Sequence, residues 1–210
     1  MKILLVLAGW VHPPYRGRVA VKEALAELAG YSFDEVGSLP EAVRLGLSDY
    51  DGLVLYYHHP GVALTREELE AFRSYVQQGG GVLAVHSATA SYKPTREYFE
   101  ILGGRFIGHG PIAPIDSRPA RSDDPIFGGI AAFTVNDELY QHELQPDIDV
   151  HFLGDQQGTP APVVWTRTVG SGRVCYVSMG HRSESMKHPT VRQILQRGLQ
   201  WVCSGSSGTG

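Results

Sequence analysis

Residues 79–92 read Gly-Gly-Gly-Val-Leu-Ala-Val-His-Ser-Ala-Thr-Ala-Ser-Tyr, and this stretch decides the fold class. The glycines end a helix pattern, and the apolar run 82–85 is typical of a parallel strand, which is buried on both faces. This strand leads directly into His86 and a turn of small residues. In open α/β sheets, ligands bind beyond the carboxyl ends of the strands. The stretch therefore predicts an α/β protein with His86 at the functional edge of a sheet.

The chain before this stretch repeats the same alternation of strand and helix. Apolar, strand-like runs occur at 2–8, 31–36 and 51–57, and the segments between them carry apolar residues at helical spacing. Repeated strand–helix units favour a parallel sheet with right-handed crossovers. The first strand is not followed by a glycine-rich phosphate loop, so the sequence carries no nucleotide-binding fingerprint.

The amino-acid composition of the chain changes after residue 104. Residues 105–162 are rich in proline, glycine and aspartate, with short strand candidates only at 112–115 and 133–135. A long segment with little regular structure inside a compact domain is usually functional. Two β-rich runs, 163–168 and 173–178, then flank a glycine-containing turn, which is typical of an antiparallel hairpin.

Composition limits the class of protein and its partners. The 210 residues suit one domain, which we expect to span 1–203, followed by a loose glycine–serine tail at 204–210. The net charge is −4 with no basic run, so we expect no nucleic-acid partner. The first apolar run is too short for a membrane helix and lacks a cleavage site. The two cysteines lack metal-ligand spacing, which favours a reducing cytoplasm.

Histidines, together with carboxylate, hydroxyl and aromatic residues, follow the predicted strands. The segments expected at the carboxyl edge of the sheet, or in the irregular region beside it, contribute Trp10, His12, His58, His59, His86, Ser87, His109, Asp137, Glu138, Tyr140, His142 and His181. Imidazoles and carboxylates in one cleft suit general acid–base chemistry or a bound metal. Other interpretations stay open. His58 or His59 could cap a strand end, His12 could be an exposed loop residue, and Asp137 could cap a helix.

Four short motifs, taken in order, resemble the ThuA-like (trehalose utilisation) family. They are 80–88 (Gly-Gly-Val-Leu-Ala-Val-His-Ser-Ala), 98–106 with His109, 137–140 (Asp-Glu-Leu-Tyr), and 172–176 with Gly180-His181. The resemblance implies the class I glutamine amidotransferase-like fold. This is a flavodoxin-like three-layer α/β sandwich with a mainly parallel central sheet and a late antiparallel hairpin.

The resemblance also bears on the type of reaction. Amidotransferases carry a nucleophilic cysteine at the strand-to-helix elbow, where this chain has His86. Cys175 falls in the hairpin and Cys203 in the last helix, so neither can replace that nucleophile, and glutaminase activity is disfavoured. The family name implies a role in catabolism of disaccharides or their keto derivatives.

From the residue types we predict isomerisation, epimerisation or elimination on a sugar. His86 and His181 are the expected acid and base, with Glu138 or Asp137 as second base or orienting group. The expected substrate-binding residues are Trp10, His12, His59, Ser87, His109, Tyr140 and His142. A divalent metal, zinc or manganese, is a further possibility, with ligands among His59, His86, His109, His142 and His181. A non-catalytic carbohydrate-binding or regulatory module is the alternative, and a homodimer is compatible with either.

Overall fold

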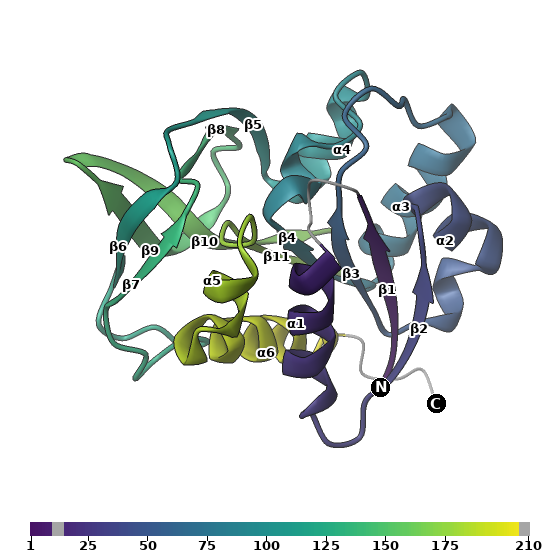
Figure 1. Ribbon diagram of the computed structural model, residues 1–210. Helices are drawn as coiled ribbons and strands as arrows, with labels where there is room; N and C mark the ends of the chain where they lie inside the picture. The colour runs from purple at the N-terminus through teal and green to yellow at the C-terminus, as the bar shows by residue number, and fades with distance from the viewer. Residues whose placement is uncertain (10–14, 206–210) are drawn as a thin grey trace.

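A nine-stranded sheet forms the centre of the protein. The computed structural model describes residues 1–9 and 15–205, and within them the strand order is β2-β1-β3-β4-β11-β10-β9-β6-β7 (Figure 1). β5 and β8 pair separately as a two-stranded sheet. The strands are β1 (Lys2–Ala8), β2 (Ser32–Val36), β3 (Gly52–Tyr57), β4 (Gly81–Val85), β5 (Gly104–His109), β6 (Ala113–Pro119), β7 (Phe133–Asp137), β8 (Tyr140–Leu144), β9 (Asp149–Gln156), β10 (Thr159–Val169) and β11 (Gly172–Val177).

Helices cover both faces of this sheet, which gives the expected three layers. α1, α5 and α6 pack on one face, and α2, α3 and α4 on the other (Figure 1). Two buried apolar clusters, one on each side, join the helices to the strands. The helices are α1 (Tyr15–Ala26), α2 (Leu39–Leu45), α3 (Arg66–Gln77), α4 (Arg96–Leu102), α5 (Ser183–Lys187) and α6 (Pro189–Cys203), with short 3₁₀ helices η1 (Leu47–Asp49) and η2 (His86–Ala90). None of the helices in the described ranges is long and apolar enough to cross a membrane.

The strands expected from continuous apolar runs are present. β3 and β4 are buried along their whole length, as central strands of a parallel sheet should be. Helix α3 begins at a capping box. The Thr65 hydroxyl accepts from the backbone N–H of Glu68 at 3.2 Å, and the Glu68 carboxylate accepts from the Thr65 N–H at 2.9 Å.

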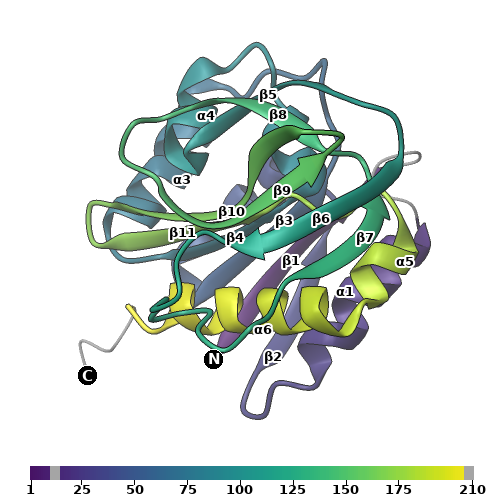
Figure 2. The same ribbon diagram turned by 90° about the vertical axis from the view of Figure 1, so that its left-hand side faces the viewer.

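The central sheet is mixed, however, where we expected a mainly parallel one. It is parallel from β2 to β11 and antiparallel from β11 to β7. Residues 105–162 supply most of the strands in the antiparallel part of the sheet. These strands form the end of the molecule nearest the viewer in Figure 2. The strand candidates at 112–115 and 133–135 cover only parts of β6 and β7, and β6 shows why the sequence pattern did not give more. Its buried Ile115 and Ser117 alternate with exposed Asp116 and Arg118, so it has no continuous apolar run.

This topology gathers polar loops at one edge of the sheet. β1, β3, β4 and β11 are parallel, so their carboxyl ends lie together at that edge. The small β5–β8 sheet lies beside η2, which follows β4. The candidate site is built where these segments meet.

Candidate functional site

His86 occupies a strained elbow between β4 and η2. Its φ of 46° lies in the left-handed region, which non-glycine residues rarely adopt. The side chain is fully buried, and its Nδ1 lies 2.8 Å from the carbonyl oxygen of Ser178. A carbonyl can only accept, so this contact assigns the ring proton to Nδ1 in the neutral tautomer. Nε2 is then the atom that His86 presents to Glu138.

Gly180 gives the His86 ring its space. A Cβ at Gly180 would lie 2.5 Å from the Cβ of His86 and 3.0 Å from its Cγ. The Tyr56 hydroxyl donates to the Gly180 carbonyl and so fixes the loop after β11. Sequence reasoning did not find Tyr56, because it reads as one of several apolar residues of a buried strand.

Glu138 lies among three imidazoles. Its Oε2 is 3.2 Å from Nδ1 of His181 and 3.7 Å from Nε2 of His86. Its Oε1 is 3.7 Å from Nδ1 of His109. Glu138 is only 6% exposed, so these interactions occur largely out of water, where electrostatic interactions are stronger. The structure thus brings together His86, Glu138 and His181, three of the four residues to which the sequence assigned acid–base roles.

Asp137 lies next to this cluster but points its carboxylate elsewhere. It accepts hydrogen bonds from the backbone N–H groups of Glu138 at 2.8 Å, Gly180 at 3.0 Å and His181 at 3.0 Å. The Ser185 hydroxyl donates to it as well. Burial raises the pKa of Asp137, and these hydrogen bonds oppose the increase. These contacts suit a residue that fixes the backbone of His181.

Tyr140 and His109 complete one side of the site. The Tyr140 ring lies against His86, with centroids 4.2 Å apart, and stacks on His109 at 5.7 Å. Tyr140 is 3% exposed, so its ring packs against the imidazoles and presents little surface to a sugar. The His109 side chain is 39% exposed and lines a hollow beside the cluster.

Other candidate residues make their polar contacts with groups outside this cluster. His142 Nε2 is 3.0 Å from the Thr89 hydroxyl, and burial lowers the pKa of His142 to about 3. His59 Nε2 is 3.2 Å from the Gly37 carbonyl. Ser87 is fully buried in η2. Trp10 and His12 fall outside the described residues, so their predicted roles stay predictions.

Neither cysteine belongs to the site. Cys175 and Cys203 are buried in β11 and α6, and burial raises the pKa of both thiols, that of Cys203 to about 12. A thiol of this kind is a poor nucleophile, because the thiolate is the reactive form. The histidine at the elbow and these buried thiols give the site no cysteine nucleophile.

Two hollows flank the cluster. One, of about 430 Å³, is lined by Tyr15, Ile112 and His181, and the other, of about 510 Å³, by Ile107, His109 and further residues of β5, β8 and β9. Both fall within the range of about 300–1,000 Å³ that small-molecule sites occupy.

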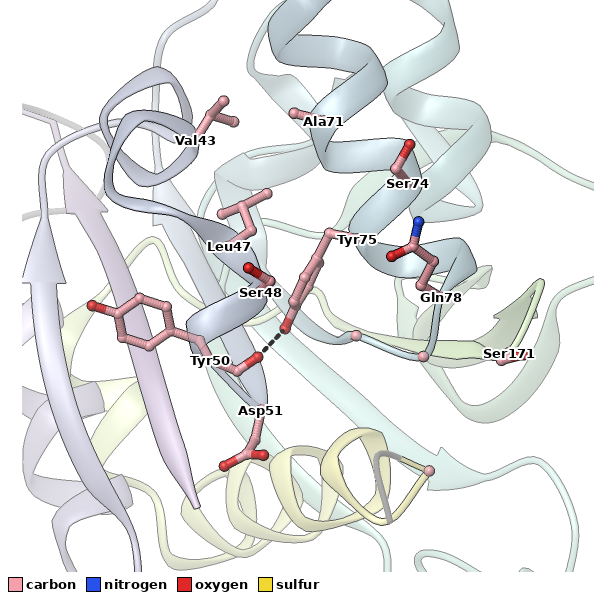
Figure 3. Close-up of a pocket in the computed structure, with 13 residues that line it drawn as sticks. Val43, Leu47, Ser48, Tyr50, Asp51, Ala71, Ser74, Tyr75, Gln78 and Ser171 are labelled. Carbon is pink, nitrogen blue, oxygen red and sulfur yellow. Dashed lines mark hydrogen bonds between the residues drawn. The ribbon is translucent and has the colours of Figure 1, made fainter. Parts of the chain in front are cut away.

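A larger cavity, of about 620 Å³, lies at the opposite edge of the sheet (Figure 3). Two of its polar side chains are engaged within the protein: the Tyr75 hydroxyl donates to the Tyr50 carbonyl, and the Asp51 carboxylate accepts from the N–H of Lys2. Among the residues that the structure describes, its lining has no group of converging imidazoles around a carboxylate, so the cluster around Glu138 is the candidate site.

Comparison with known proteins identifies the family. A family model described as ThuA, trehalose utilisation, matches residues 2–202. The chain belongs to the ThuA family. This confirms the resemblance that the sequence motifs indicated, and membership supports a role in carbohydrate metabolism. No curated protein matches the sequence.

Solved structures that are similar to this ThuA-family chain share its fold. A ThuA-like protein from Parabacteroides merdae is 21% identical, with a TM-score of 0.83 over 98% of this chain and 90% of that one. A ThuA-like protein from Bacteroides uniformis is 21% identical, with a TM-score of 0.79 over 96% and 91%. The cytoplasmic protein STM1381 from Salmonella typhimurium is 14% identical, with a TM-score of 0.69 over 96% and 99%.

Proposed function

We propose that this ThuA-family protein is an enzyme that moves a proton at a carbon next to the carbonyl group of a keto sugar. The observation that carries the proposal is the Glu138 carboxylate, buried and within 3.7 Å of nitrogen atoms of three imidazoles. These are the groups that general acid–base catalysis uses near neutral pH. The elbow that holds a nucleophile in amidotransferases holds an imidazole here.

The reaction needs one group to take a proton and one to give it. A base in the cluster removes the proton from the carbon next to the carbonyl, and the electron pair of the C–H bond moves toward the carbonyl oxygen. A neighbouring imidazolium gives a proton to that oxygen, which yields an enediol. Return of a proton to either carbon completes isomerisation or epimerisation. Loss of a leaving group from the next carbon, with a proton supplied to it, completes elimination.

The substrate we propose is a keto derivative of a trehalose-type disaccharide, in which one hydroxyl group has been oxidised to a ketone. The hollows on either side of the cluster offer room for a ring on each side of the reacting carbon. The family description supports a disaccharide. We place the enzyme in the cytoplasm, as STM1381 is described.

Proton exchange tests this function directly. The protein is incubated with the keto derivative of trehalose in deuterium oxide, and NMR follows loss of the proton signal next to the carbonyl. We expect catalysed exchange that Glu138→Gln reduces at least about 100-fold, within the range general acid–base groups contribute. Glu143→Gln is the matched control, because Glu143 lies on the same strand as Tyr140, is largely exposed, and should leave exchange unchanged.

The same experiment separates the enzyme from a non-catalytic carbohydrate-binding module. The absence of a nucleophile at the elbow is the observation that favours such a module. A module would bind the sugar, as calorimetry would show, with no catalysed exchange and with affinity preserved in His86→Ala. That pair of results would refute the enzymatic proposal.

A further inference from the structure

We infer that His86, Glu138 and His181 form a binding site for a divalent first-row transition metal, with zinc and manganese as the expected ions. The inference deepens the proposed function, on which it rests for the reaction that the metal would assist. Binding itself stands on the arrangement of the three side chains and can be tested without a sugar.

The spacing of the three side chains fits one ion. Each offers a ligand atom, and the three atoms all lie within 4.8 Å of one another. Metal–ligand bonds of about 2.0–2.2 Å at tetrahedral angles put ligand atoms roughly 3.3–3.6 Å apart. The Glu138 Oε2 atom lies 3.2 Å from His181 Nδ1 and 3.7 Å from His86 Nε2, so small rotations would bring all three onto one ion.

The surroundings hold these ligands as a metal site requires. Metal-bound histidines usually donate their other ring N–H to a carbonyl or carboxylate, which fixes the tautomer and the ring. His86 has such a contact, since its Nδ1 lies 2.8 Å from the Ser178 carbonyl. Asp137 holds the backbone of His181 and of Glu138. The ligands come from three separate segments of the fold, and their positions are set before any ion binds.

The donor set also selects the class of ion. Two imidazoles and one carboxylate suit zinc and other first-row metals, and leave further coordination positions open for a substrate. The inferred set differs from the ligand list expected from the sequence. His59 and His142 contact Gly37 and Thr89, and a carboxylate takes the third position.

A cation here would polarise the sugar carbonyl and so favour removal of the proton beside it. With His86, Glu138 and His181 as ligands, His109 is the imidazole that remains to exchange protons with the substrate. Its side chain is partly exposed, with Nδ1 2.7 Å from the Gly110 carbonyl oxygen and 3.7 Å from Glu138 Oε1. Two of the three imidazoles would then bind the metal, and the third would carry a proton.

Cobalt(II) is the probe, because it binds where zinc does and its visible absorption reports coordination number. The chelator-treated protein is titrated with cobalt(II), and calorimetry with zinc gives the affinity. We expect one equivalent of cobalt with an intense spectrum of low coordination number. Glu138→Gln and His181→Gln should each weaken zinc binding at least about 100-fold, a larger loss than supporting residues usually cause. Glu143→Gln should bind zinc as the wild type does, because the Glu143 side chain is largely exposed and pairs with Arg96 and Arg105.

The outcomes separate the two proposals. Absence of cobalt and zinc binding in the wild type, or unchanged binding in both ligand variants, would overturn the metal site and leave proton exchange to be judged by its own assay. Metal binding that follows the ligand variants but no exchange with the keto sugar would support the site and refute the proposed reaction. Circular dichroism of each variant shows whether a loss of binding comes from unfolding, and Glu138→Gln preserves the size and shape of the side chain.

Discussion

Asp137→Asn tests whether Asp137 anchors the site or takes part in its chemistry. The carboxylate accepts from three backbone N–H groups, of Glu138, Gly180 and His181, and from the Ser185 hydroxyl. Asparagine keeps the size of the side chain but replaces one accepting oxygen by an NH₂ donor. With its oxygen toward Glu138 and His181, that NH₂ group faces the Gly180 N–H, which then has no acceptor.

The size of the effect follows from these contacts. A buried N–H left without an acceptor costs about 1–3 kcal/mol. The two retained hydrogen bonds lose the help of the negative charge and about half their strength, a further cost of roughly 1–2 kcal/mol. Removing a buried charge offsets part of this, because burial raises the pKa of Asp137 and so disfavours its charged form. We expect a net destabilisation of about 2–4 kcal/mol.

Urea denaturation followed by fluorescence measures this change, and calorimetry should show a fall in Tm of roughly 5–15 °C for a chain of this size. Asp155→Asn is the control. The Asp155 carboxylate accepts from the Gly158 N–H at 2.7 Å in an exposed turn, so its loss should cost under about 1 kcal/mol. Equal stability of the two variants, with proton exchange lost only in Asp137→Asn, would refute the anchoring role and restore Asp137 as a catalytic candidate.

Three further substitutions test other contacts in the structure. Gly180→Ala places a Cβ 2.5 Å from that of His86, so we expect at least tenfold weaker zinc binding, whereas Gly108→Ala, with open space around its Cβ position, should bind normally. Burial opposes ionisation of Asp124, but hydrogen bonds from two backbone amides and an imidazole hold its pKa below the usual value. The ionised Asp124 therefore stabilises the folded state above its unfolded pKa of about 3.9, and this stabilisation is lost as pH falls through the folded pKa. Asp124→Asn should consequently flatten the acid side of a plot of unfolding free energy against pH. Thr65→Ala removes the cap of α3 and should lower the unfolding free energy by about 1 kcal/mol in urea.

The parallel half of the fold could be predicted because burial on both faces leaves a strong pattern. β1, β3 and β4 are continuous apolar runs, and each coincides closely with a predicted strand. The other half has one solvated face on most strands. β8, for example, reads Tyr-Gln-His-Glu-Leu and carries no apolar run, so its pairing with β5 depends on tertiary contacts that a local pattern does not contain.

In the candidate site, too, the sequence predicted some residues and left others undecided. Position at a strand end was enough to select His86 and His181, because the topology brings the ends of parallel strands together. It did not exclude His59, because a residue near a strand end can turn either into the cleft or back toward the protein. The His59 ring turns back, to the Gly37 carbonyl. Side-chain direction in such loops is set by backbone dihedrals that the sequence leaves open.

The adjacent pair Asp137 and Glu138 shows how the fold gives two similar residues different roles. The sequence offers two neighbouring carboxylates without distinguishing them. In the structure β7 ends at Asp137 and the chain turns, so the two side chains leave the backbone in different directions. Asp137 enters the loop that carries His181, and Glu138 enters the space between the imidazoles. One carboxylate therefore fixes the position of a histidine that the other contacts, and a cation bound by Glu138 and His181 would depend on both.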